Sequence, residues 1–257
     1  MRLINRSKEV AVNVVTIKWG TLYGPQYVNR LRASVERNLS IPFRFVCFTD
    51  DVHQLDERIE TYPLPPVDIP DVPTRSSNWR KLGLYQSGIG DLNGLCLYLD
   101  LDIVVVGSID CFFDYEPEKF CAVSEWVQAH RKVVARRPAE YNTSVFRFEA
   151  GTTQKVVDRF HQEGERILRD FRREQQFVTN TVKDSIQPWP SDWVVSFKRQ
   201  CLPAFPMNLI KLPALPPLAK IVVFHGHPNP DQAAAGYRDG PWHRKCLATP
   251  WVRDHWR

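Results

Sequence analysis

The stretch Leu97–Val106 reads LYLDLDIVVV, an apolar run interrupted by two carboxylates. Successive side chains of a strand point to opposite faces, so in one continuous strand Asp100 and Asp102 share a face. Aspartate is disfavoured in strands, and two like charges about 4 Å apart repel by ~4 kcal/mol at an effective dielectric of about 20. A divalent cation bound to carboxylate oxygens would offset this repulsion. The stretch therefore predicts a buried strand that carries a metal site.

An alternative interpretation ends the strand near Leu99 and leaves both aspartates solvated in a turn. The apolar residues Ile103–Val106 argue against it, because they continue the strand pattern beyond Asp102. The continuous strand with a metal site is the preferred interpretation.

Segments of strand and helix character alternate along the first part of the chain. Glu9–Ile17 and Phe43–Phe48 are rich in β-branched and aromatic residues, and Tyr27–Asn38 between them has apolar residues at helical spacing. This alternation predicts an α/β fold, a single Rossmann-like domain over residues 9–232 with a mostly parallel central sheet flanked by helices. Other expected elements are strands at 120–123, 143–148 and 221–224, helices at 78–88, 152–169 and 175–182, and an irregular proline-rich loop at 63–73.

The bulk composition is that of an ordinary water-soluble globular protein. The 257 residues are 43% hydrophobic and 25% charged, and no stretch reaches the apolar length that spans a bilayer. The net charge of +5 does not by itself indicate nucleic acid, and we expect no nucleic-acid partner. The six cysteines are scattered without a CxxC pair, and the N-terminus lacks a signal-peptide pattern. A cytoplasmic location is therefore expected.

A basic tail over residues 233–257 carries Trp242, Trp251 and Trp256. One interpretation docks the tail on the domain through these tryptophans. The other places them at an anionic membrane surface, which would put the protein at the inner face of the cell membrane. Docking is the preferred interpretation, and the two are compatible.

His225 lies in the run FHGHPNP at the expected end of a strand. Gly226 beside it permits close approach of the backbone. A histidine in such a place is often structural. Because this chain contains both this run and the aspartate pair, we predict that His225 is the third metal ligand.

These motifs, in this order, resemble glycosyltransferase family 8 and its bacterial relatives. The order is Leu-Asp-x-Asp, an asparagine in a short strand, an acidic-Gln pair and His-Gly-x-Pro-x-Pro, and the resemblance covers about Val10–Pro230. It implies a GT-A fold and transfer of a hexose from UDP-galactose or UDP-glucose to a glycan or glycolipid acceptor, with retention, in bacterial surface polysaccharide or lipopolysaccharide synthesis. It also implies that manganese, or magnesium, is held by Asp100, Asp102 and His225 and grips the nucleotide diphosphate.

The same resemblance implies roles for the other site residues. Glu174 would bind sugar hydroxyls, and Gln175 would present its amide oxygen to the oxocarbenium-like centre; a plain polar first turn of a helix is the alternative. Lys81 matches a basic donor-binding position, although a solvated helix-surface lysine is equally compatible with its sequence context. The complete set expected at the donor is Thr16, Lys18, Tyr27, Asp50, Lys81, Asp100, Asn142, Ser144, Lys198 and Gly226.

One position departs from the family pattern. Asn229 stands where the family has a lysine that contacts the diphosphate, so one positive charge is missing. We hypothesise that Lys198 or Arg199 supplies it.

Three other activities are alternatives. A catalytically weak UDP-sugar-binding relative is compatible with Asn229. A phosphatase of the haloacid dehalogenase type also begins with Asp-x-Asp after an apolar strand, but Ile103 and Val104 stand where that motif has glycine and a hydroxyl residue. A sugar-nucleotide pyrophosphorylase is disfavoured because Gly20–Gly24 lacks the basic residues of its phosphate loop.

Overall fold

The computed structural model describes residues 11–68, 79–126 and 141–257. The start of the predicted domain at residue 9 and the end of the predicted loop at 63–73 lie outside the described residues. The strands are β1 (Val12–Lys18), β2 (Phe43–Thr49), β3 (Glu60–Tyr62), β4 (Leu95–Leu99), β5 (Ile103–Val105), β6 (Phe120–Ser124), β7 (Tyr141–Glu149), β8 (Ile186–Pro188), β9 (Val194–Ser196) and β10 (Ile221–Val223). The helices are α1 (Pro25–Asn38), η1 (Arg80–Tyr85), η2 (Ile89–Asp91), α3 (Cys111–Asp114), α5 (Gln154–Asp170), α6 (Glu174–Thr181), η3 (Phe197–Cys201), η4 (Met207–Leu209), α7 (Pro230–Ala235), η5 (Trp242–Arg244) and α8 (Pro250–His255).

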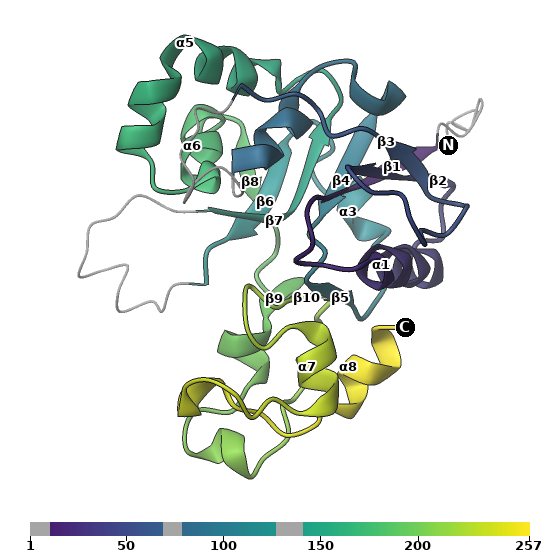
Figure 1. Ribbon diagram of the computed structural model, residues 1–257, viewed down its shortest axis with the longest axis vertical. Helices are drawn as coiled ribbons and strands as arrows, with labels where there is room; N and C mark the ends of the chain where they lie inside the picture. Colours follow the sequence, from purple (N-terminus) through teal and green to yellow (C-terminus); the bar gives the residue numbers. More distant parts are fainter. Residues whose placement is uncertain (1–10, 69–78, 127–140) are drawn as a thin grey trace, which may run out of the picture.

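A seven-stranded sheet in the order β3-β2-β1-β4-β7-β6-β8 forms the centre of the molecule. Neighbouring strands pair in parallel except at β7, which is antiparallel to both β4 and β6. Helix α1 covers one face of the sheet, and α5 and α6 lie on the other (Figure 1). The predicted α/β fold with a mostly parallel central sheet is confirmed.

Each inner strand contributes to two hydrophobic cores, one on each face of the sheet. Leu97 belongs to the core with α1, whereas the next residue, Tyr98, belongs to the core with η1, α5 and α6. Val14 and Val15 of β1 divide in the same way. Because both faces of these strands are buried, apolar residues occupy neighbouring positions, as in Val14-Val15 and Leu97–Leu99, rather than alternate ones.

The stretch 97–106 is not one strand, so that prediction is wrong. β4 ends at Leu99, a turn contains Leu101 and Asp102, and β5 then enters a second, three-stranded sheet in the order β5-β10-β9. The amide of Asp100 donates to the carbonyl of Ser144 at 2.9 Å, and the carbonyl of Asp102 accepts from the amide of Phe224 at 3.0 Å. The turn keeps both carboxylates out of the two apolar cores, where unpaired charges are costly.

Other local expectations differ from the structure in detail. The helix expected at 78–88 is the 3-10 helix η1, and residue 78 lies outside the described residues. The sequence pattern did not predict β3, β8 or β9, each of which has three residues. Such short strands contain too few side chains to show a period of two.

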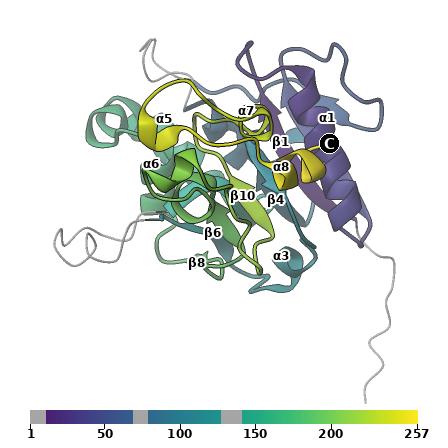
Figure 2. The same ribbon diagram turned by 90° about the horizontal axis from the view of Figure 1, so that it is seen from below.

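The C-terminal tail docks on the domain, as preferred from the sequence. Trp256 is buried against Tyr27 of α1, with the ring centroids 5.0 Å apart, and the guanidinium of Arg30 lies 4.1 Å from the Trp256 ring centroid. Figures 1 and 2 show α8 beside α1. The predicted boundary at residue 233 falls inside α7, so the tail begins within a helix that starts in the predicted domain.

Across the three described ranges, every helix is too short or too polar to cross a bilayer.

We expect Trp256→Ala to lower the free energy of unfolding by about 3–5 kcal/mol, because truncation of a buried tryptophan leaves a cavity. The matched control is Trp242→Ala, since Trp242 is 62% exposed whereas Trp256 is 6% exposed. The control should cost under ~1 kcal/mol. Urea denaturation followed by circular dichroism measures both; equal losses would contradict the docked tail.

Candidate active site

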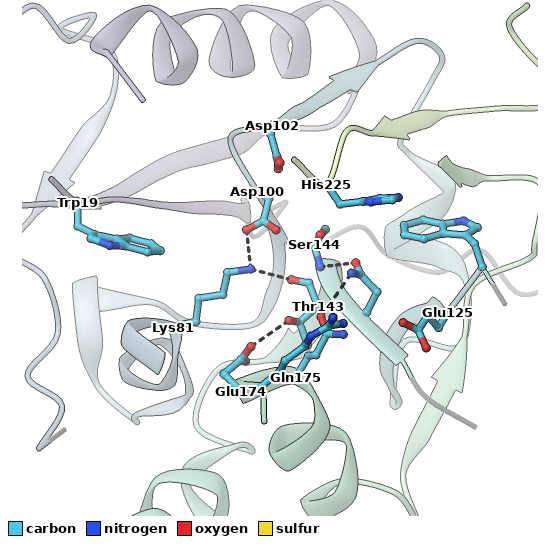
Figure 3. A pocket seen from close by; sticks show the side chains of 13 residues that line it. Trp19, Lys81, Asp100, Asp102, Glu125, Thr143, Ser144, Glu174, Gln175 and His225 are labelled. Carbon is cyan, nitrogen blue, oxygen red and sulfur yellow. Dashed lines mark hydrogen bonds and ion pairs between the residues drawn. The ribbon is translucent and has the colours of Figure 1, made fainter. Parts of the chain in front are cut away.

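A cavity of about 390 Å³ lies where β1, β4 and β6 end and where β7 and α6 begin (Figure 3). The carboxyl ends of parallel strands meet at one edge of the sheet, and the antiparallel β7 begins at that edge. His225, which follows β10 of the second sheet, also lines the cavity. The lining residues are Trp19, Lys81, Asp100, Asp102, Glu125, Trp126, Asn142, Thr143, Ser144, Arg173, Glu174, Gln175 and His225.

Asp100 is held on one of its two oxygens. Its Oδ1 accepts a hydrogen bond from the Tyr98 hydroxyl at 2.7 Å and lies 2.6 Å from Lys81 Nζ. Lys81 also donates to the carbonyl of Thr143 at 3.4 Å. Lys81 is thus a partly buried lysine that bridges β4 and β7, and the surface-lysine interpretation is wrong.

Asp102 is the more deeply buried of the two aspartates, with 9% of its surface exposed. Burial raises the pKa of Asp102 to about 6, with the charge of Asp100 as the second cause, while Lys81 and hydrogen bonds from the Gly226 amide and the Tyr23 hydroxyl oppose the shift. The repulsion expected from the sequence is therefore present, although the two carboxylates lie in a turn and not on one strand.

The residues predicted to bind metal fit a hard cation only in part. Asp100 and Asp102 both line the cavity and present carboxylate oxygens, which suit manganese or magnesium. His225 lines it too, but its Nε2 lies 2.7 Å from the Ser196 hydroxyl and its ring stacks on Trp126 at 5.4 Å. Among the residues that the structure describes, no three His, Cys, Asp or Glu side chains form a ready ligand group. The predicted metal site stays a prediction.

Glu174 and Gln175 stand in the first turn of α6, facing the cavity from the side opposite Asp102 (Figure 3). Glu174 is 4% exposed and accepts hydrogen bonds from the Tyr85 hydroxyl at 3.3 Å and the Thr143 hydroxyl at 3.2 Å. Burial raises the pKa of Glu174 to about 7. The Asn142 amide donates to Gln175 Oε1 at 3.4 Å.

The structure therefore brings eight of the predicted site residues to one cavity. They come from five separate segments of the chain, and they are Lys81, Asp100, Asp102, Asn142, Ser144, Glu174, Gln175 and His225.

Four predicted donor-binding residues lie outside the lining and contact other parts of the protein. The Thr16 hydroxyl donates to the carbonyl of Leu99, and the Tyr27 hydroxyl donates to Asp231. The remaining two, which lie at the ends of β1 and β2, are Lys18, paired with Asp51 at 3.7 Å, and Asp50, which accepts from the amide of Gly20.

The last two predicted residues, Lys198 and Gly226, also lie outside the lining but adjoin His225, which lines the cavity. Lys198 Nζ donates to the His225 carbonyl at 2.7 Å. Gly226 has φ +79°, a left-handed conformation that favours glycine. Burial, followed by the charge of Lys198, lowers the pKa of His225 to about 4, which keeps the imidazole neutral near pH 7.

Sequence reasoning missed five residues that line the cavity: Trp19, Glu125, Trp126, Thr143 and Arg173. The position of each residue in the sequence could have identified it, because each closely follows a predicted strand or is next to a predicted site residue. Trp126, whose Nε1 donates to the carbonyl of Val194 at 3.1 Å, joins the end of β6 to the second sheet.

No protein-family model matches the chain, and no curated protein matches it. Solved structures do match. An active-site mutant of LgtC aligns with TM-score 0.61 and 14% identity over 94% of this chain and 93% of that one. The chain has a GT-A-type glycosyltransferase fold. The galactosyltransferase LgtC in complex with donor and acceptor sugar analogs has TM-score 0.59 and 16% identity over 94% of this chain and 93% of that chain.

A longer glycosyltransferase shares the same fold. GlyE of Streptococcus pneumoniae TIGR4 aligns with TM-score 0.60 and 13% identity over 95% of this chain and 60% of that one. At such low identity these similarities establish the fold, and the chemistry has to be argued from the cavity itself.

We expect Glu174→Gln to flatten the dependence of stability on pH. Glu174 has a pKa near 7 when folded and near 4.5 otherwise, so the folded state binds its proton more tightly. This stability is fully present below about pH 4.5 and decreases by about 3 kcal/mol as the pH rises to 7. Urea denaturation from pH 4.5 to 8 measures the slope.

The matched control is Glu165→Gln on the exposed surface of α5, which should keep the wild-type curve. If the free energy of unfolding of Glu174→Gln depended on pH as that of the wild type does, burial would not raise the pKa of Glu174, and the expectation would be contradicted.

Proposed function

We propose that the protein is a metal-dependent glycosyltransferase that moves a hexose from UDP-galactose or UDP-glucose to a glycan or glycolipid acceptor, with retention. The observation that carries this proposal is the cavity in which an aspartate pair faces a cluster of polar side chains, Asn142, Glu174 and Gln175. Its volume of about 390 Å³ is within the range of small-molecule sites. The shared fold with LgtC, a galactosyltransferase, supports the reaction class.

The aspartate pair is the proposed diphosphate end of the site. A divalent cation bound there would act as a Lewis acid for the departing diphosphate. Asp100 and Asp102 would hold the cation, and the neutral His225 is the third candidate. Lys81 and the Tyr98 hydroxyl fix Oδ1 of Asp100, which leaves Oδ2 for the cation.

The opposite wall is the proposed sugar end. Glu174 is oriented by the Tyr85 and Thr143 hydroxyls, so its carboxyl group is positioned before a sugar binds. Gln175 is oriented by Asn142. In the proposed reaction the bond between the anomeric carbon and the diphosphate breaks, and the Gln175 amide oxygen stabilises the positive charge that develops on the sugar. The acceptor hydroxyl oxygen forms the new bond to the anomeric carbon, and its proton passes to the oxygen of the leaving diphosphate.

A catalytically weak UDP-sugar-binding protein is the second candidate, because Asn229 replaces the family lysine. Asn229 instead is the N-cap residue of α7. Its backbone amide donates to Gln232 Oε1 at 2.9 Å, as part of a capping box. Lys198 beside Gly226 is the proposed replacement cation.

The test is thermal unfolding with UDP, with and without Mn²⁺. A ligand that binds the native state stabilises it by about 2.7 kcal/mol at about one hundred times its dissociation constant. We expect a clear stabilisation that requires Mn²⁺, and loss of it in Asp102→Asn. The control Asp114→Asn, an exposed residue at the end of α3, should keep it.

A wild-type protein that shows no Mn²⁺-dependent stabilisation by UDP would contradict the metal-bound donor. Binding without hydrolysis of UDP-galactose or UDP-glucose would favour the second candidate.

A membrane-bound acceptor and a cytoplasmic location at the inner face of the membrane belong to the same proposal. Residues 197–257 contain nine Lys or Arg and three Asp or Glu, an excess of positive charge larger than the net +5 of the whole chain. Five large apolar side chains in this region are exposed: Phe205 56%, Ile210 72%, Leu212 54%, Leu218 62% and Trp242 62%. Basic residues around exposed apolar ones suit an anionic bilayer.

The structure changes which residues would contact the lipid. Trp256 is buried and Trp251 donates to the carbonyl of Pro213, so the tail tryptophan that remains exposed is Trp242. The Asn208 amide joins η4 to the carbonyls of Trp242 and Lys245 at 2.8 Å, which sets both segments in one surface.

We expect the double variant Ile210→Ser, Trp242→Ser to reduce sedimentation with phosphatidylglycerol vesicles about tenfold or more, because two apolar contacts are lost. The exposed control Val52→Ser, beyond the end of β2, should sediment like the wild type. Wild-type protein that does not bind these vesicles would contradict the proposed membrane contact.

A further inference from the structure

Arg173 lines the cavity immediately before Glu174 and Gln175. It is solvent-exposed, and its backbone carbonyl accepts from the amides of Gln176 and Phe177. Within the described residues, its guanidinium takes part in no hydrogen bond or ion pair. Its charge does reach across the cavity, since it contributes to lowering the pKa of His225.

Lys81, which lines this cavity, and Lys198, which contacts the lining residue His225, already donate to protein oxygens. Lys81 Nζ is 2.6 Å from Asp100 and also donates to Thr143. Lys198 Nζ donates to the His225 carbonyl. The guanidinium of Arg173 differs from both, because it offers five donors in a fixed fork and none of them meets an acceptor in the part of the chain that the structure describes.

We infer that Arg173 binds an anionic oxygen group of the substrate in this cavity. A guanidinium accommodates phosphate and carboxylate in the same two-pronged geometry. The group is either the diphosphate of the sugar nucleotide or a carboxylate on the sugar, as in a uronic acid. The inference rests on the proposed function and extends it, because it states that an anionic group of the substrate contacts Arg173.

The neighbouring Arg172 provides a matched control. It is exposed like Arg173, carries the same charge and is one residue away, but it does not line the cavity. Arg172→Gln therefore reproduces the change in net charge without removing a donor from the cavity. Arg173→Lys keeps the charge and removes the fork.

Calorimetric titration with Mn²⁺ present measures the binding of uridine, UDP, UDP-glucose, UDP-glucuronate, inorganic pyrophosphate and glucuronate. We expect Arg173→Gln to weaken anionic probes about tenfold or more and to leave uridine unchanged, because hydrogen bonds to charged groups are the stronger ones. Arg172→Gln should match the wild type, and Arg173→Lys should lose less than Arg173→Gln.

The pattern of losses identifies the source of the charge. A contact with the diphosphate weakens UDP, both UDP-sugars and pyrophosphate alike. A contact with a sugar carboxylate weakens UDP-glucuronate and glucuronate and leaves UDP and UDP-glucose unchanged.

Equal behaviour of Arg173→Gln and Arg172→Gln with every probe would overturn the inference, as would an equal loss for uridine. Failure of the proposed function is distinguishable. A wild-type protein that binds no uridine nucleotide would contradict the donor assignment, and pyrophosphate and glucuronate would still report on Arg173.

Discussion

The ion pair between Lys81 and Asp100, at 2.6 Å, is the contact on which the cavity depends. It offsets one of two neighbouring carboxylates at a place where burial already raises the pKa of the other, Asp102. Lys81 also donates to Thr143 at the start of β7, so the same ammonium group connects η1, the end of β4 and the wall that carries Glu174. Without this cation the two aspartates would keep only the hydrogen bonds from Tyr98, Tyr23 and the Gly226 amide against their repulsion.

The turn at Leu101 and Asp102 has a second consequence, because it passes the chain from the large sheet to the small one. β5 pairs with β10, and the chain after β10 brings His225 to the cavity beside Asp100 and Asp102 (Figure 3). Trp126 and the docked α8 join the two parts further. The cavity is therefore built where two sheets meet, and its polar residues come from both.

Much of the fold was predictable from local patterns, and so were the aspartate pair and His225. Lys81, Asn142, Ser144, Glu174 and Gln175 were predicted from the family resemblance. β2, α1, β6, β7 and α5 lie within two residues of their expected bounds at each end, and β1 runs from Val12 to Lys18 where Glu9–Ile17 was expected. The family resemblance placed Lys18 and Tyr27 at the donor, yet Asp51 and Asp231 are their partners in the fold. Those partners are distant in sequence or on another element, so no local pattern shows that the side chains are already committed.

The sequence by itself determined the α/β class, the aspartate pair as an electrostatic problem and the segments that carry polar residues at strand ends. These depend on side-chain alternation and charge, which are local properties. Only the tertiary structure decided that the strand breaks at Leu99, that Lys81 compensates Asp100 and that Arg173 meets no acceptor among the described residues. Each of these features depends on contacts between groups far apart in the chain, and those contacts exist only once packing has brought the groups together.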